Sequence, residues 1–274
     1  MSSRLVLRQT LRYDYPSPIG GLRHRLMVLP PARHGDQGLV SSSLDVRGAP
    51  AEVVTSLDRF GNVAVEVRAA RVQGWVEFLV DVTVRRDGGP GARVASPEPF
   101  LDPTPLTAPD AALAAAARRL LAGGHRDLEL ADRVNAWVAS AMRYRQDVTS
   151  VRTTAAEALA LGRGVCQDYA HVMVALCRLC GLPARYVSGH LVGEGGSHAW
   201  VEVLLPSPED PSRLTAVAFD PTNDRRAGSR YLTVAVGRDY ADVAPTWGTY
   251  SGPPGGRLTS TKTLDEGTAD LVPA

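Results

Sequence analysis

The spacing of apolar residues changes once along this chain, and the change divides it into two regions. Up to about Arg86, valine and leucine alternate with polar residues in short runs, of which 62–67 and 78–84 are the clearest. An alternation of period two places apolar side chains on one face of a β-strand. Residues 1–86 are therefore expected to form a β-rich N-terminal domain, and the glycine- and proline-rich stretch 87–109 to form a linker.

Beyond the linker, apolar residues recur at helical spacing. The pattern predicts a longer apolar helix over 166–180, preceded by shorter helices capped by Asp110, Asp127 and Thr154. Strand-like runs follow at 184–192, 199–205 and 215–219. Helices followed by strands indicate an α+β core in which helices pack on an antiparallel sheet.

We assign this core to residues 110–248. The remaining stretch, 249–274, is rich in glycine, proline, serine and threonine. Such a composition buries little apolar surface and predicts a flexible tail.

Composition narrows the classes of function. The chain has 274 residues, 44% of them hydrophobic, which is enough for a sizeable core in one large or two small domains. Its 30 lysine and arginine residues balance 29 aspartate and glutamate residues, so the net charge is +1. A chain this neutral has no general attraction to nucleic acid or anionic lipid, and we expect neither nucleic acid nor membrane as a partner.

The sequence also bears on location. Apolar runs stay well below the ~18 residues needed to cross a bilayer. Charge interrupts the stretch 1–8, where a signal peptide would be apolar. Three cysteines, all within 166–180, are an odd and clustered set that argues against a secreted disulfide framework. We therefore expect a cytoplasmic protein, and the sequence does not predict its oligomeric state.

Cys166 directly follows a glycine-containing turn and opens the predicted apolar helix. At a helix N-terminus, unpaired backbone amides and the positive end of the helix dipole stabilise a thiolate. The position therefore suits a nucleophile. The alternative is that Cys166 is a small buried residue in an apolar helix, which is the commonest fate of a free cysteine.

Two further residues could complete a thiol catalytic group. His198 opens a strand after the glycine-rich loop 193–197, and Asp220 ends the next strand. If these strands pair antiparallel, the start of one lies beside the end of the other, and Asp220 can orient the imidazole. Separately, His198 could be structural and Asp220 could belong to a turn. Together with Cys166 they supply the nucleophile, base and orienting acid of thiol acyl transfer.

These motifs resemble those of the transglutaminase-like superfamily of papain-like thiol enzymes, in its bacterial form with a β-rich N-terminal region. The resemblance is carried by 164–171, 177–189, 198–203 and 219–223. It implies a papain-like, transglutaminase-like core. It also implies that Cys166 is the nucleophile, His198 the base and Asp220 the orienting acid.

The implied reaction begins when the Cys166 thiolate attacks an amide carbonyl and His198 protonates the leaving amine, which leaves a thioester on the enzyme. Water as acceptor makes the protein a protease or amidase. An amine as acceptor makes it a transglutaminase, that is, a protein-glutamine gamma-glutamyltransferase. We expect hydrolysis of a peptide or protein amide, with no cofactor and no metal. A non-catalytic protein-binding module is the alternative from a different class.

Three other residues are candidate substrate contacts. Gln167 follows the nucleophile on the first helical turn, and Trp200 shares the strand face of His198. Tyr144 lies upstream in the expected substrate-side loop, close to Gln146. Core packing explains Trp200 at least as well.

Two roles are not settled by these motifs. The backbone amide of Cys166 is the expected first oxyanion donor, and the second is left unassigned. Cys177 and Cys180 form a Cys-x-x-Cys pair, but no second pair follows at metal-ligand spacing, so both are expected to pack in the helix.

Overall fold

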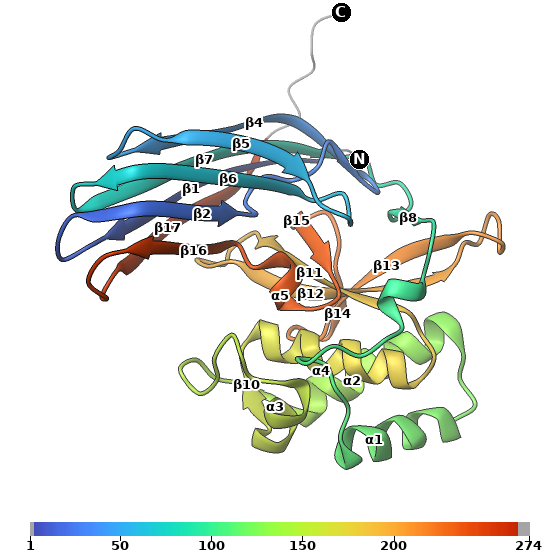
Figure 1. The fold of residues 1–274 in the computed structure, drawn as a ribbon. Helices are drawn as coiled ribbons and strands as arrows, with labels where there is room; N and C mark the ends of the chain where they lie inside the picture. Colours follow the sequence, from blue (N-terminus) through green and yellow to red (C-terminus); the bar gives the residue numbers. More distant parts are fainter. Residues whose placement is uncertain (1–2, 268–274) are drawn as a thin grey trace, which may run out of the picture.

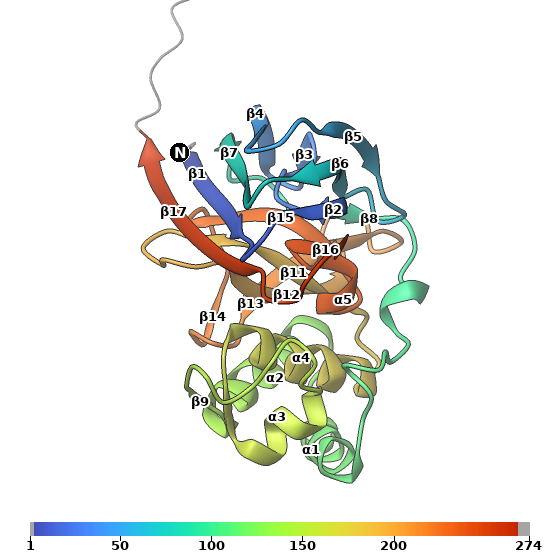
Figure 2. The ribbon, with the colours of Figure 1, turned by 60° about the vertical axis from the view of Figure 1, so that its left-hand side comes forward.

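The computed structural model describes residues 3–267, which fold into four layers: the two sheets of a β-sandwich, a further sheet and a layer of helices. The sandwich forms one end of the molecule, the further sheet, which we call the core sheet, lies beneath it, and helices cover the far face of the core sheet (Figure 1). The turned view shows the same order, with the core sheet between the sandwich and the helices (Figure 2). In the described residues no helix is long and apolar enough to span a membrane.

The sandwich pairs two antiparallel sheets, with strand orders β17-β1-β7-β4-β3 and β16-β2-β6-β5. The predicted alternation is present: on β7, Val76, Phe78 and Val80 are at most 1% exposed and face the interior between the sheets. The strands are β1 (Ser3–Asp14), β2 (Ile19–Leu26), β3 (Arg33–His34), β4 (Gln37–Arg47), β5 (Glu52–Leu57), β6 (Val63–Val72), β7 (Trp75–Arg86), β16 (Thr246–Ser251) and β17 (Arg257–Gly267).

The last two strands correct two predictions. β17 pairs with β1 over its whole length, from Arg4 opposite Gly267 to Asp14 opposite Arg257. The predicted flexible tail is therefore wrong for β16 and β17, and residues 268–274 lie outside the described residues. The sandwich is also not confined to 1–86. Composition was misleading here, because β17 is held by backbone pairing at the edge of a sheet and needs few apolar residues. Only Leu264 of this strand is buried.

The core sheet, together with the helices, forms the core that the sequence predicted, and the α+β class is confirmed. Its strand order is β14-β13-β12-β11-β15, with β8 beside β13, and all pairs are antiparallel. The strands are β8 (Arg93–Val94), β11 (Ala184–Leu191), β12 (His198–Pro206), β13 (Leu214–Asp220), β14 (Arg225–Arg226) and β15 (Tyr231–Gly237). The expected runs correspond to β11, β12 and β13, whereas β15 was not predicted.

Helix α4 (Cys166–Leu179) runs through the helical layer and is buried along most of its length. Around it pack α1 (Ala111–Ala122), α2 (Asp127–Ala141) and α3 (Ala155–Leu161), while α5 (Tyr240–Val243) follows β15. Asp110 and Thr154 cap α1 and α3 as predicted. Asp127 instead begins α2, because the N-cap residue is Arg126. A short parallel pair, β9 (Arg143–Tyr144) and β10 (Arg163–Gly164), precedes α4.

The predicted linker is an ordered connection. It carries β8 and a 3₁₀ turn, η1 (Glu98–Phe100), down one side of the molecule (Figure 1). The Arg178 guanidinium of α4 is buried and donates hydrogen bonds to the carbonyls of Phe100 and Asp102, each at 3.0 Å. Burial lowers the pKa of Arg178 to about 10. The segment is therefore bound to the core by a buried cation.

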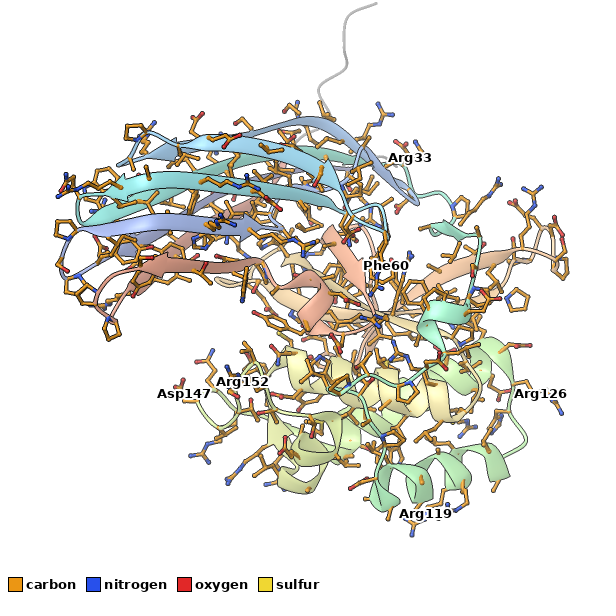
Figure 3. All side chains as sticks on the ribbon, viewed as in Figure 1. Arg33, Phe60, Arg119, Arg126, Asp147 and Arg152 are labelled. Carbon is orange, nitrogen blue, oxygen red and sulfur yellow. The ribbon has the colours of Figure 1, made fainter. Side chains whose placement is uncertain are left out.

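Polar side chains also join the sandwich to the core sheet. The Gln37 amide exchanges hydrogen bonds with the backbone of Thr233, and the Asn62 amide does so with Val236, all at 2.8 or 2.9 Å. Phe60, labelled in Figure 3, lies at this junction, 5.5 Å from the Phe100 ring between centroids. The hydrogen bonds of Gln37 and Asn62 fix the sandwich to the core sheet.

Candidate active site

The start of α4 holds Cys166 in a fixed position. The carboxylate of Asp168 turns back and accepts hydrogen bonds from the Val165 amide and the Thr149 hydroxyl, both at 2.7 Å. A Cβ on Gly164 would lie 2.4 Å from Asp168 Oδ2, so the turn before the cysteine requires glycine. The Gly-Val-Cys-Gln-Asp sequence thus forms a helix start that is capped by its own aspartate, and Cys166 is partly exposed there.

The antiparallel pairing of β12 and β13 brings His198 and Asp220 together, as the sequence predicted. Val201 lies opposite Phe219 in this register, so the first residue of β12 lies beside the last of β13. His198 Nε2 is 2.8 Å from Asp220 Oδ2. The two residues are 2% and 0% exposed.

The electrostatics of this pair favour its charged form. Burial lowers the pKa of His198, but hydrogen bonds to Asp220 and Cys166 outweigh burial and raise that pKa to about 10. Burial raises the pKa of the Asp220 carboxyl, but the hydrogen bond from His198, the charge of its imidazole and further hydrogen bonds together outweigh burial and leave this pKa below its usual value. The imidazole is therefore protonated at neutral pH. With Nε2 engaged by Asp220, Nδ1 is the ring nitrogen that faces the thiol.

A cleft of about 620 Å³ opens in front of Cys166 and His198. One wall comes from the loop between β9 and α3, where Figure 3 labels Asp147 and Arg152, and the other from the 193–198 loop and the chain near α5. Its lining includes Tyr144, Gln146, Gln167, Ser188, Glu194, Ser197 and Tyr240. The arrangement gives an extended substrate access to the thiol between two loop-bearing walls.

Comparison with known proteins agrees with this geometry. Residues 114–216 match the model of the transglutaminase-like superfamily, and residues 5–85 match the bacterial transglutaminase-like N-terminal region. The Mycobacterium leprae protein ML0607 is 33% identical over 226 residues, which cover 78% of this chain and 74% of that relative. Rv2569c of Mycobacterium tuberculosis is 33% identical over 250 residues, covering 77% of this chain and 76% of the relative.

The chain belongs to the transglutaminase-like superfamily.

A solved structure from Cytophaga hutchinsonii, described as a "putative cysteine protease", has the same fold as this transglutaminase-like protein. The TM-score is 0.80 at 20% sequence identity, and the match covers 100% of this chain and 93% of that one. The similarity therefore extends through both the sandwich and the transglutaminase-like core.

Of the predicted substrate contacts, the cleft of the transglutaminase-like core contains Tyr144 and Gln167 but not Trp200. Trp200 is 1% exposed. Its ring stacks 6.1 Å from the His198 imidazole and meets the Tyr231 ring edge-on at 5.3 Å. A Cβ on Gly189 would lie 2.6 Å from this indole, so the neighbouring strand leaves room for it. Trp200 therefore packs against the imidazole, as the core-packing alternative predicted, and it does not line this cleft.

Asp220 has partners that sequence reasoning missed. The Tyr231 hydroxyl and the Asn223 amide each donate to Asp220 Oδ2 at 2.7 Å, and the Thr222 backbone amide donates to Oδ1 at 3.0 Å. Arg225 Nε donates to the Tyr231 oxygen at 2.9 Å. Asn223 belongs to the 219–223 motif, but nothing in the local sequence links Tyr231 to Asp220.

Cys177, Cys180 and His171 have packing or hydrogen-bonding roles in the structure. Cys177 is 0% exposed, and burial raises the pKa of its thiol. Burial also raises the pKa of Cys180, to about 11. Residues 3–267 contain no group of three or more His, Cys, Asp and Glu side chains placed to hold a metal ion. His171 Nε2 accepts a hydrogen bond from the Tyr240 amide at 3.2 Å, which ties α4 to the cleft wall.

Proposed function

We propose that this protein is a thiol hydrolase that cleaves amide bonds in peptides or proteins. The observation that carries the proposal is a buried imidazole with Nε2 held by Asp220 and Nδ1 facing Cys166 at the floor of a cleft. A nucleophile, a base and an orienting acid in this order are the parts of thiol acyl transfer.

The reaction proceeds in two steps. The Cys166 thiolate attacks the carbonyl carbon, the carbon–nitrogen bond breaks, and the leaving nitrogen takes the proton from His198 Nδ1. Backbone amides at the start of α4 have no partner within the helix and can donate to the oxyanion. Water then gives a proton to Nδ1 and attacks the thioester, and the electrons of the carbon–sulfur bond return to Cys166.

Hydrolysis is favoured over transamidation by the surroundings of the thiol. Cys166 is partly exposed, and the polar side chains of Gln146, Gln167, Ser188 and Ser197 line the cleft. Such groups hold water beside a thioester. An amine acceptor would have to compete with that water.

The test offers both acceptors at once. The protein is incubated with a casein digest in the presence of a fluorescent primary amine, and the products are analysed by mass spectrometry. We expect new peptide amino termini, no incorporated amine, and no reaction with Cys166→Ala. Cys180→Ala, which removes a half-buried thiol of the same helix, should behave as wild type.

Two outcomes would overturn the proposal. Amine incorporation at glutamine without new termini would identify a transglutaminase. Absence of any Cys166-dependent product, together with peptide binding that Cys166→Ala leaves unchanged, would identify a binding module.

A further inference from the structure

The 193–197 loop brings a carboxylate to the catalytic imidazole. Glu194 Oε2 is 3.2 Å from His198 Nδ1, the ring nitrogen that faces Cys166. The Glu194 side chain is 40% exposed and lines the cleft. Within the described residues 3–267, the lining of this cleft contains no other carboxylate. Glu194 therefore places a carboxylate beside the atom that transfers the proton.

The loop is anchored at both ends, which fixes the position of this charge. The Glu194 amide donates to the Leu191 carbonyl at 3.2 Å, closing a turn in which Gly193 has a φ of +92°. At the other end, Lys262 of β17 donates to the Gly196 carbonyl at 2.5 Å. Lys262 is half-buried, and burial lowers its pKa against the raising effect of the Glu194 charge.

The chemistry identifies which half of the substrate meets Glu194. In acylation, His198 Nδ1 gives its proton to the leaving nitrogen, so the amine portion of the amide must lie against Nδ1. In deacylation the same atom takes a proton from the attacking nucleophile. By microscopic reversibility, an incoming amine would occupy the same place. Glu194 thus faces the nitrogen-bearing side of the reaction whichever acceptor is used.

We propose that Glu194 makes the enzyme select amides whose amine portion carries a positive charge, such as a basic residue directly after the scissile bond. This inference rests on the proposed function. A carboxylate at this point attracts an amine portion that carries a cationic side chain and repels one that carries an acidic side chain.

The test uses charged thiol reagents, because they report the field at Cys166 without any known substrate. Methanethiosulfonates with a trimethylammonium, a neutral methyl or a sulfonate tail each transfer their thioalkyl group to the thiolate and release methanesulfinate. The rate at Cys166 is measured at low ionic strength by mass spectrometry. A cation and an anion should differ by about tenfold for one charge a few ångströms away in partly aqueous surroundings.

Glu194→Gln should bring the cation-to-anion rate ratio down by about tenfold, and Glu194→Asp should retain most of it. Added salt should reduce the wild-type ratio by screening. Glu209→Gln, which neutralises an exposed carboxylate in the β12–β13 hairpin, is the control and should leave the ratio unchanged.

A cation-to-anion ratio that Glu194→Gln leaves unchanged, with Cys166 still reactive, would overturn the selectivity. So would an equal fall in all three rates, which would make Glu194 a positioning residue for the imidazole. A wild-type Cys166 that reacts no faster than Cys180 would contradict the proposed function itself, and this inference with it.

Discussion

The segment 198–202 of strand β12 carries a histidine–carboxylate contact at each of its two ends, and these ends differ in what lies on the remaining side of the contact. At the first, His198 Nε2 is 2.8 Å from Asp220 Oδ2. At the other, Glu202 Oε1 is 2.8 Å from His34 Nε2, a residue of the sandwich. Both carboxylates are at most 5% exposed. Distance and burial therefore do not separate the pair that we propose to be catalytic from a structural one.

The third partner separates them. The second oxygen of Glu202 accepts from Arg185 Nε at 2.7 Å, so this carboxylate is enclosed between Arg185 and His34. Burial opposes its ionisation, but His34 and Arg185 hold the pKa of Glu202 far below its usual range. At the other end, His198 Nδ1 faces the Cys166 thiol at an open cleft, with only the partly exposed Glu194 carboxylate beside it, at 3.2 Å. A ring nitrogen directed at a nucleophile marks the reactive end.

The largest effect on stability should come from removing the Glu202 carboxylate, which is enclosed between His34 and Arg185; we call this the closed end. Glu202→Leu leaves Arg185 buried without its counter-charge, and loss of one partner of a buried ion pair costs about 3–5 kcal/mol. We expect the free energy of unfolding in urea to fall by that amount. Cys166 should still alkylate at the wild-type rate under native conditions.

A matched exposed pair provides the control. His125 Nδ1 lies 2.7 Å from Glu129 Oε1, with the Glu129 side chain 64% exposed. Glu129→Gln should have little measurable effect, because solvent screens such a pair. Equal losses in Glu202→Leu and Glu129→Gln would show that the His34–Glu202–Arg185 contact does not hold the sandwich to the core.

The next largest effect is on the pH dependence of stability. The His198 end should lose its contribution to the free energy of unfolding at alkaline pH, and the Glu202 end should lose its contribution at acid pH. The folded pKa of His198, about 10, exceeds its unfolded value of 6.5, so the folded chain keeps a proton that the unfolded chain releases. Its contribution is complete below pH 6.5 and is lost as pH rises towards 10, by up to about 1.4 kcal/mol per pH unit. Glu202, with a lowered pKa, stabilises above about pH 4.5 and loses its contribution below it.

Urea unfolding from pH 3.5 to 9.5 tests this difference. Glu202→Gln should flatten only the acid limb of the stability profile. His198→Ala should flatten the alkaline limb, and it should also weaken the acid limb in part, because Asp220 loses a hydrogen bond that lowers its pKa. An alkaline limb that Glu202→Gln flattened as well would show that the two ends are not electrostatically independent.

The reactive end could be predicted from the sequence because its parts lie at the ends of elements that local patterns define. A glycine turn and an apolar run set the position of Cys166, and alternation placed His198 and Asp220 on neighbouring strand ends. The antiparallel pairing of β12 and β13 then brings the latter two together.

The closed end and the outer partners could not be predicted in this way. Glu202 meets His34 across 168 positions, and Lys262 meets Gly196 across 66. Arg178 shows why: on an apolar helix its charge predicts exposure, yet backbone carbonyls of distant segments satisfy it. Contacts of this kind leave no periodicity in the sequence.

A smaller effect should come from the outer partner of Asp220. Tyr231→Phe removes one hydroxyl donor from Oδ2 while His198, Asn223 and Thr222 remain. One such bond to a charged group is worth about 1.5 kcal/mol, so Cys166 alkylation at pH 7 should slow by about tenfold at most. Tyr250→Phe, whose hydroxyl donates to Pro253 in the sandwich, is the control. A wild-type alkylation rate in Tyr231→Phe would show that the Tyr231 hydroxyl does not support the Asp220–His198 pair.

The smallest effect concerns the contact that the sandwich makes with the reactive end. Lys262→Met keeps the length of the side chain but removes its hydrogen bond to Gly196 and its charge near Glu194. These two losses act in opposite directions. A freed loop lets Glu194 move from His198, which lowers the preference for cationic reagents, whereas removal of a positive charge raises it.

We expect the loop to dominate, because the bond to Gly196 is direct while Lys262 is partly solvated. The cation-to-anion rate ratio at Cys166 should fall by about two- to threefold, with faster amide hydrogen exchange across 193–197. Lys262→Arg keeps the charge and a donor, and should restore both. A ratio that rises in Lys262→Met, with exchange unchanged, would mean that the sandwich influences the reactive end through charge and does not hold its loop.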